Sequence, residues 1–289
     1  MCRFVAYLGE PVLAEDLITK PRNSLIHQSY HARETPEPLN GDGFGMGWYS
    51  KNIRPEPGLF KAITPAWNNQ NLKINAGIIK SNCIFAHIRA ATEGDISLAN
   101  SHPFRYQQYL MMHNGGIRNF KEIKRDLINR LSNHYYQWIN GQTDSEHVFA
   151  LFMQKIADLA QGKQGDALPL KFLADCFRQT FADIEILKTK RGLSSASVYN
   201  MVVTDGARLL ATRYSTNPKE ESRTLYYAKG KKYACRGNLC QMLPEDGPPG
   251  SVLVVSEKLD EFEEEWRKVP DNHALLVEND LHCQLIPLR

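Results

Sequence analysis

The sequence predicts an α+β protein in which strand-rich segments at both ends of the chain flank a helical middle. Short apolar runs bounded by turn residues dominate up to about residue 116 and again from about residue 197. Between them, apolar residues recur every three or four positions, which is typical of amphipathic helices. No repeat, low-complexity tract or linker divides the 289 residues, so we expect one domain, residues 2–289, with strands from both ends packed between helical layers.

Four apolar runs in the first part of the chain predict strands. The opening run MCRFVAYLGE is apolar on both faces, which indicates a buried strand at the N-terminus. The other three are FGMGWYS at 44–50, NCIFAHIRAAT at 82–92 and YLMMHNGG at 109–116. The last two end in polar residues or glycine, a pattern typical of core strands whose ends present side chains to a site.

Three helices are expected in the middle of the chain. A helix over 118–134 is predicted by the spacing of Ile117, Phe120, Ile123, Leu127 and Leu131. A second helix, DSEHVFALFMQKIADLA, begins at Asp144, which is a good N-cap residue. A third covers roughly 168–187.

The last part of the chain returns to strands. SVYNMVVTDGARLLATRY predicts a hairpin around the Asp205-Gly206 turn, and HALLVENDLHCQLI predicts another around Asn279-Asp280. LYYAKGKKYACRG and GSVLVVSE have the same character. The acidic run EKLDEFEEEW at 257–266 predicts a solvated helical or loop face, because like charges usually lie in water.

Composition excludes several function classes. With 42% hydrophobic and 23% charged residues the chain is typical of globular proteins. No window approaches the roughly 18 apolar residues of a membrane span, and no apolar signal core follows the N-terminus, so we expect a cytoplasmic protein without a membrane partner. The net charge of +3, from 35 basic and 32 acidic residues, is too scattered to predict a nucleic-acid partner.

The six cysteines predict reduced thiols. They are Cys2, Cys83, Cys176, Cys235, Cys240 and Cys283. Their spacing matches no small disulfide scaffold, and a chain of this length needs no disulfide to hold its core. Cys235 and Cys240 flank RGNL, but without a second Cys or His pair a structural zinc site is weakly indicated, and strand or loop cysteines are favoured.

Cys2 differs from the other cysteines because it directly follows the initiator methionine. If Met1 is removed, the thiol and a free α-amine share one carbon atom, which gives a nucleophile with its own base attached. Such a nucleophile needs further groups that converge on Cys2, and four other segments offer candidates.

Arg89, in HIRAAT, stands at the end of a predicted buried strand. A buried guanidinium is costly without an anionic partner. A bidentate clamp on a substrate carboxylate is the functional interpretation, and an internal ion pair is the structural one.

The sequence HNGG at 113–116 offers the side-chain amide of Asn114 and the unobstructed backbone N–H of Gly115. These two donors could form an oxyanion hole, although an Asn-Gly turn at a strand end explains the same residues.

Two further segments have alternative interpretations. The glycines of NGDGFG at 40–45 allow close approach of the backbone to another element, and the absence of a Lys-Ser/Thr ending excludes a phosphate loop. Asp144, in TDSEH, either caps its helix or accepts hydrogen bonds from a substrate ammonium.

Together these segments resemble a known family. Met1-Cys2-Arg3, NGDGFGMGWY, HIRAAT, NSHPF, HNGG and TDSE occur in the order and spacing of class II glutamine amidotransferases, which are N-terminal-nucleophile hydrolases. The resemblance covers the chain nearly end to end and implies a four-layer αββα sandwich. It also implies an N-terminal cysteine exposed by methionine removal and chemistry that needs no metal and no cofactor.

The resemblance assigns roles to matching positions. Cys2 is the nucleophile, and Asn114 with Gly115 forms the oxyanion hole. Arg89 holds the α-carboxylate of a glutamyl group and Asp144 its α-ammonium. Thr92 and His102 match positions that line or support the glutamine pocket, and a purely structural role is the alternative for His102.

Two positions differ from the larger synthases of this class and indicate which members of the family the chain resembles more. Those enzymes usually carry Trp after the clamp arginine and His after the threonine, whereas this chain has Ala90 and Glu93. No acceptor domain is expected after residue 289. The closer resemblance is to stand-alone members: the γ-glutamyl hydrolase type of the ergothioneine pathway and the subunit type of fungal glutathione degradation.

Four functions remain compatible with the sequence. The first is a hydrolase of a small-molecule γ-glutamyl substrate, and the second is a glutaminase subunit that serves a separate synthase or peptidase subunit. The third is a non-catalytic binding or regulatory protein that retains the pocket. The fourth is an acylase for apolar acyl groups, for which a paired Arg89 and Asp144 clamp makes little sense.

Overall fold

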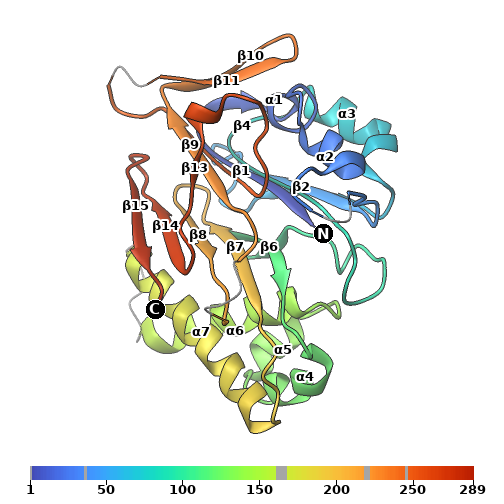
Figure 1. Cartoon of the computed structure of the whole chain (residues 1–289), viewed down its shortest axis with the longest axis vertical. Coiled ribbons are helices and arrows are strands. Elements are labelled where there is room, and N and C mark those ends of the chain that lie inside the picture. Colours follow the sequence, from blue (N-terminus) through green and yellow to red (C-terminus); the bar gives the residue numbers. More distant parts are fainter. Residues whose placement is uncertain (1, 36–37, 161–167, 218–221, 245–246) are drawn as a thin grey trace.

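The computed structural model describes residues 2–35, 38–160, 168–217, 222–244 and 247–289. Met1 lies outside these residues, so its removal stays a prediction. Two large sheets, in which every neighbouring pair of strands is antiparallel, form the centre of the molecule (Figure 1). Both sheets are built from strands that are distant in sequence.

The first sheet has seven strands in the order β13-β9-β12-β1-β4-β2-β3. Their bounds are β1 Arg3–Leu13, β2 Phe44–Trp48, β3 Gly58–Ala62, β4 Lys80–Ile88, β9 Tyr226–Gly230, β12 Ser251–Val255 and β13 Arg267–Lys268. The N-terminal strand β1 therefore lies in the middle of the sheet, between β12 from the C-terminal part of the chain and β4.

The second sheet has six strands in the order β15-β14-β8-β7-β6-β5. Their bounds are β5 Phe104–Tyr106, β6 Tyr109–Gly116, β7 Val198–Thr204, β8 Leu209–Arg213, β14 His273–Val277 and β15 Cys283–Pro287. The predicted turns at Asp205-Gly206 and Asn279-Asp280 join β7 to β8 and β14 to β15, which confirms both hairpins.

Helices cover the outer faces of the two sheets (Figure 1). Against the first sheet lie α1 Glu15–Ile18, α2 Leu25–His31 and α3 Gln70–Ala76, with the short 3-10 helix η1 Ala66–Asn68. Against the second lie α4 Phe120–Ile128, α5 Asn133–Trp138, α6 Asp144–Ala160 and α7 Leu170–Lys190. The layers are helix, sheet, sheet and helix, so the predicted αββα sandwich is confirmed.

The alternation of side chains along β1 shows how the layers are filled. Phe4 and Ala6 point into the core between the two sheets, whereas Val5 and Tyr7 face α1 to α3. All four are completely buried, which explains why the N-terminal run is apolar on both faces.

The helix predicted over 118–134 is wrong in its continuity, because the structure has two helices there, α4 and α5. At the break, the Gln154 side chain of α6 donates to the carbonyl of Arg130 and accepts from the amide of Ser132, at 2.8 and 2.6 Å. These bonds satisfy backbone groups that the interrupted helix leaves unpaired. A partner 22 and 24 positions away leaves no mark in local periodicity.

The expectation of six reduced thiols is wrong for one pair. Strands β10 Lys232–Arg236 and β11 Leu239–Leu243 form a separate hairpin with a turn at Gly237 and Asn238. Cys235 and Cys240 stand directly opposite each other in this hairpin and form a disulfide. The four intervening residues form the end of the hairpin, so the two sulfur atoms lie side by side across its turn.

The acidic run at 257–266 is only partly solvated. A short 3-10 helix, η2 Glu263–Glu265, has no buried residue, and its first two glutamates are exposed as expected. Glu257, in contrast, is buried and pairs with the buried Arg3, with 3.0 Å between Nε and Oε2. Its carboxylate also accepts hydrogen bonds from the backbone amides of Arg33 and Glu34 and from the Asn23 side chain. Glu257 thus joins the residues on either side of α2 to the first residues of β1.

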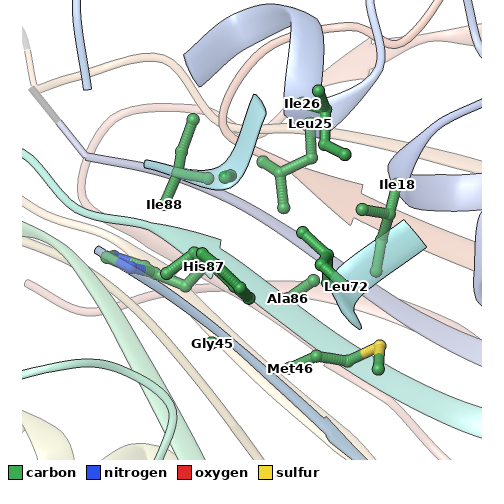
Figure 2. A pocket seen from close by; sticks show the side chains of 11 residues that line it. Ile18, Leu25, Ile26, Gly45, Met46, Leu72, Ala86, His87 and Ile88 are labelled. Carbon is green, nitrogen blue, oxygen red and sulfur yellow. The ribbon is translucent and has the colours of Figure 1, made fainter. Parts of the chain in front are cut away.

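A small cavity of about 10 Å³ lies between the first sheet and helices α1 to α3 (Figure 2). Its walls include Ile18, Leu25 and Leu72, and the imidazole of His87 points away from these side chains. The space is near the lower limit for one water molecule, so it cannot serve as a substrate pocket.

No helix in the described parts of the chain is long and apolar enough to cross a membrane. The cytoplasmic location stays a prediction.

We predict that Glu257→Ala lowers the free energy of unfolding by about 3–5 kcal/mol, because it leaves the Arg3 guanidinium buried without its counter-charge. Urea denaturation followed by circular dichroism measures this change. Asp175→Ala is the control, since it removes a pair with Arg178 that is exposed to solvent and should leave the midpoint nearly unchanged. Equal midpoints for both variants would show that the buried pair does not stabilise the N-terminal strand.

Candidate active site

Cys2 immediately precedes β1. Because side chains alternate along a strand, Cys2 faces the space between the sheets, as Phe4 does two positions later. The Sγ atom is partly buried and lies 3.5 Å from the carbonyl oxygen of Ala90, to which it donates. On the opposite face of β1, Nη1 of Arg3 donates to the Cys2 carbonyl at 3.0 Å. The Arg3–Glu257 pair therefore holds the backbone that carries the thiol.

Arg89 follows β4 and lies one residue before the carbonyl that contacts Cys2. Its buried guanidinium donates hydrogen bonds to the backbone carbonyls of Glu93, Gly94 and Asp95, at 2.9 to 3.1 Å. Burial lowers the pKa of Arg89, while Cys2 and acidic neighbours act in the opposite direction. In this structure Arg89 orders the 93–95 loop, and its remaining N–H groups are those that could meet a carboxylate.

The glycine-rich segment 40–45 packs directly against the strand end that bears Arg89. The amide of Asp42 donates to the Arg89 carbonyl, and the amide of Arg89 donates to the Gly43 carbonyl, at 3.0 and 2.8 Å. A Cβ atom on Gly45 would lie 2.1 Å from the His102 carbonyl oxygen, so only glycine fits there. The expectation that these glycines permit close approach is confirmed.

Asn114 lies in β6 on the face that points between the sheets, like Met112 two positions earlier. Its Oδ1 accepts a hydrogen bond of 2.9 Å from Nη1 of Arg223. Its Nδ2 is buried and has no hydrogen-bond partner among the described residues. An unpartnered buried donor costs about 1–3 kcal/mol, so this amide is a ready donor for a bound ligand.

Gly115 faces two close neighbours. A Cβ atom there would lie 2.0 Å from the Val198 carbonyl oxygen and 2.4 Å from Nε2 of His113. Close packing alone therefore requires glycine, whether or not its N–H contributes to an oxyanion hole.

Asp144 is the first residue of α6, and its buried carboxylate lies near the end of β6. Oδ2 accepts a hydrogen bond of 2.7 Å from the amide of Ile117, and Oδ1 accepts from the amide of Ser145. The predicted N-cap role falls instead to Thr143, whose Oγ1 accepts from the amide of Glu146. Asp144 thus joins β6 to α6 and keeps lone pairs for another donor.

Thr92 and His102 lie in different surroundings. Thr92 is exposed. His102 is buried against His87, with ring centroids 4.2 Å apart, and neither of its ring nitrogens has a partner among the described residues. Burial lowers the pKa of His102 well below its ordinary value and that of His87 to about 3, so both rings are neutral. These contacts fit a supporting position behind the site.

Arg223 is a functional candidate that the sequence analysis missed. It is partly buried, bonds to Asn114, and interacts electrostatically with Cys2 and Asp144. One guanidinium therefore connects three residues that come from distant parts of the sequence. The surrounding letters, ESRTLYY, contain no motif that could have identified it.

Among the described residues, no group of three or more His, Cys, Asp and Glu side chains is arranged to hold a metal ion. Arg89 and Asp144 instead carry the opposite charges that a ligand with both a carboxylate and an ammonium requires.

Comparison with known proteins identifies the family. A model of class II glutamine amidotransferases matches residues 16–279. The probable glutamine amidotransferase DUG3 of Saccharomyces cerevisiae is 37% identical over 291 residues, which cover 96% of this chain and 82% of the yeast protein. The chain belongs to the class II glutamine amidotransferases. Membership confirms the predicted family and makes the chain an amidohydrolase.

Other relatives of this amidotransferase agree with the assignment. The γ-glutamyl-hercynylcysteine sulfoxide hydrolase of Mycolicibacterium smegmatis is 26% identical over 293 residues, with complete coverage of both chains. The structure of a glutamine aminotransferase class-II domain protein from Silicibacter pomeroyi has a TM-score of 0.66 at 22% identity, with 99% of each chain covered. Glutamine phosphoribosylpyrophosphate amidotransferase of Bacillus subtilis has a TM-score of 0.59 at 16% identity, and 49% of that chain is covered. The two structures share the fold.

We predict that iodoacetamide at pH 8 alkylates Cys2 in the native amidotransferase much faster than Cys83. Cys83 is completely buried, and burial raises its pKa to about 12, so the reactive thiolate is scarce and inaccessible there. Peptide mass spectrometry of time-quenched samples measures both rates. The urea-unfolded chain is the control, in which the two thiols should react at similar rates, and equal rates in the native protein would contradict the described burial.

Proposed function

We propose that this amidotransferase hydrolyses the amide bond of a γ-glutamyl compound through a thioester on Cys2. The observation that carries the proposal is the arrangement around Arg223, whose guanidinium bonds Asn114 and interacts with Cys2. Arg223 is thereby a neighbour of both the Cys2 nucleophile and the Asn114 side chain, whose Nδ2 donor is buried without a partner among the described residues. Acyl transfer requires this combination of an attacking thiol and a donor for the developing oxyanion.

The reaction begins with proton transfer from the Cys2 thiol. After removal of Met1, the α-amine, whose ordinary pKa is about 7.7–8.0, is partly free base near neutrality and takes this proton directly or through water. The sulfur then attacks the γ-carbonyl carbon of the substrate. The π electrons of that carbonyl move to its oxygen, and the tetrahedral intermediate carries a negative charge there.

Asn114 and Gly115 stabilise the tetrahedral intermediate. The Nδ2 group of Asn114 and the backbone N–H of Gly115 donate to the oxyanion. As the intermediate collapses, the C–N bond breaks and the amine leaves with the proton held by the α-amine. Water then attacks the thioester, glutamate is released, and the Cys2 thiol is restored.

Arg89 and Asp144 account for selection of a glutamyl group. The guanidinium of Arg89 binds the α-carboxylate, and the carboxylate of Asp144 accepts from the α-ammonium. Both side chains are already held by backbone groups, Arg89 by the 93–95 loop and Asp144 by Ile117 and Ser145. This prior ordering reduces the entropy lost when the substrate binds. We propose supporting positions for Thr92 and His102 at the edge of and behind this pocket.

The similarity to a γ-glutamyl-hercynylcysteine sulfoxide hydrolase supports a substrate whose leaving amine is larger than ammonia. We also propose that residues 2–289 form one domain, because β1 pairs with β12 from the other end of the chain. A glutaminase subunit that serves a separate synthase or peptidase is the alternative.

We predict that the Met1-processed protein releases glutamate from γ-glutamyl amides, that Cys2→Ala abolishes this release, and that Cys83→Ala retains most of it. Alanine cannot form the thioester, whereas Cys83 lies in the core between the sheets. Enzymatic assay of glutamate measures the rates, and circular dichroism verifies that both variants are folded. Turnover by Cys2→Ala would contradict the proposed nucleophile.

The same assay separates the hydrolase from the glutaminase subunit. We expect at least one γ-glutamyl amide of a bulky amine, such as a γ-glutamyl-cysteine derivative, to give a higher kcat/KM than glutamine. Preference for glutamine over every bulkier amide would favour the subunit that delivers ammonia to a partner.

A further inference from the structure

An oxyanion hole that uses an asparagine must control which end of the amide faces the substrate. The side chain has a carbonyl oxygen that accepts and an NH2 group that donates, and a rotation of 180° exchanges them. Only the NH2 group can stabilise an oxyanion, so the reversed orientation would repel the transition state. The Asn114 amide therefore needs a neighbour that accepts one orientation alone.

Arg223 meets this requirement because a guanidinium has donors and no acceptor. Its Nη1 donates to Oδ1 of Asn114 at 2.9 Å. In the reversed orientation, the Asn114 NH2 group would face the guanidinium, and two donors would oppose each other. The bond to Oδ1 thus leaves Nδ2 on the other side, where it is buried without a partner among the described residues.

The backbone of Arg223 is itself fixed to the strand beside Asn114. Asn200, in β7, is the residue directly opposite Asn114 in β6. Its Nδ2 donates to the carbonyls of Arg223 and Thr224 at 2.8 and 3.2 Å. Nε of the buried Arg213 also donates to the Arg223 carbonyl, at 2.9 Å. The two facing asparagines therefore hold opposite ends of one residue, Asn200 its backbone and Asn114 its side chain.

We propose that Arg223 is a positioning residue that locks the Asn114 amide with Nδ2 toward the oxyanion, and that Asn200 holds Arg223 in place for this purpose. The inference rests on the proposed function, and it adds a role that the sequence motifs do not contain. Arg223 acts on the reaction through Asn114, so its effect must disappear when the Asn114 amide is absent.

A kinetic double-mutant cycle tests this dependence in the Met1-processed protein, with the best γ-glutamyl amide as substrate. We expect Asn114→Ala to lower kcat by about 10²–10³-fold, the usual effect of losing one oxyanion donor, and Arg223→Ala to lower it by at least about tenfold. KM should change by less than about threefold in each variant, because the lost interaction exists only in the transition state. In the Asn114→Ala background, Arg223→Ala should lower kcat by less than about threefold.

Arg208→Ala is the matched control. Arg208 is a buried arginine in the turn between β7 and β8, where it bonds to Asp205 and to the carbonyl of Leu168, which precedes α7. Its loss should reduce stability and leave kcat of the folded protein unchanged. Independent, multiplicative effects of Arg223→Ala and Asn114→Ala on kcat would overturn the inference, as would an Arg223→Ala effect confined to stability.

A second measurement decides the inference even if the proposed function fails. If the wild type hydrolyses no γ-glutamyl amide, that function is wrong, but the orientation of Asn114 can still be observed by nuclear magnetic resonance of asparagine side-chain amides. We expect one sharp pair of Asn114 Nδ2 proton signals in the wild type and an exchange-broadened or shifted pair in Arg223→Ala. Unchanged signals would overturn the inference.

Discussion

The pairing of β1 with β4 on one side and β12 on the other determines where Cys2, the proposed nucleophile, lies. A strand at the centre of a sheet is held by hydrogen bonds along both edges, so its first residues cannot fray as a free chain end would. The buried Arg3–Glu257 pair adds a second constraint at the same place, because Arg3 also donates to the Cys2 carbonyl. The backbone that carries Cys2 is thereby held as firmly as a strand within the core.

Three arginines of the site, Arg3, Arg89 and Arg223, interact with Cys2 or with its neighbours, and each donates hydrogen bonds to a nearby acceptor. Arg3 has the Glu257 carboxylate, and Arg89 has three backbone carbonyls. Arg223 has the Asn114 oxygen, and the electrostatic interactions with Cys2 and Asp144 oppose the effect of burial, which lowers its pKa. This arrangement favours a developing oxyanion without leaving isolated charges in the interior.

Much of the fold and part of the candidate site could be predicted from the sequence. Features that depend on neighbouring residues were predicted, whereas features that depend on contacts between distant residues were not. Apolar alternation identified β1, β4 and β6, and the polar residues at their ends indicated Arg89 and Asn114 as candidates, because such patterns are local. Arg223, Glu257 and Gln154 were missed because each acts on residues far away in sequence and carries no local signature. The Cys235–Cys240 disulfide was missed because four residues between cysteines do not by themselves reveal a hairpin.

The central claim is that Cys2 becomes acylated during turnover, and mass spectrometry of acid-quenched enzyme tests it most directly. Met1-processed protein is mixed with its best γ-glutamyl amide, quenched during steady-state turnover, and digested. We expect the N-terminal peptide that contains Cys2 to gain the mass of one γ-glutamyl acyl group, and the Cys83 peptide to remain unmodified. Glutamate production with the acyl group on another residue would contradict the account.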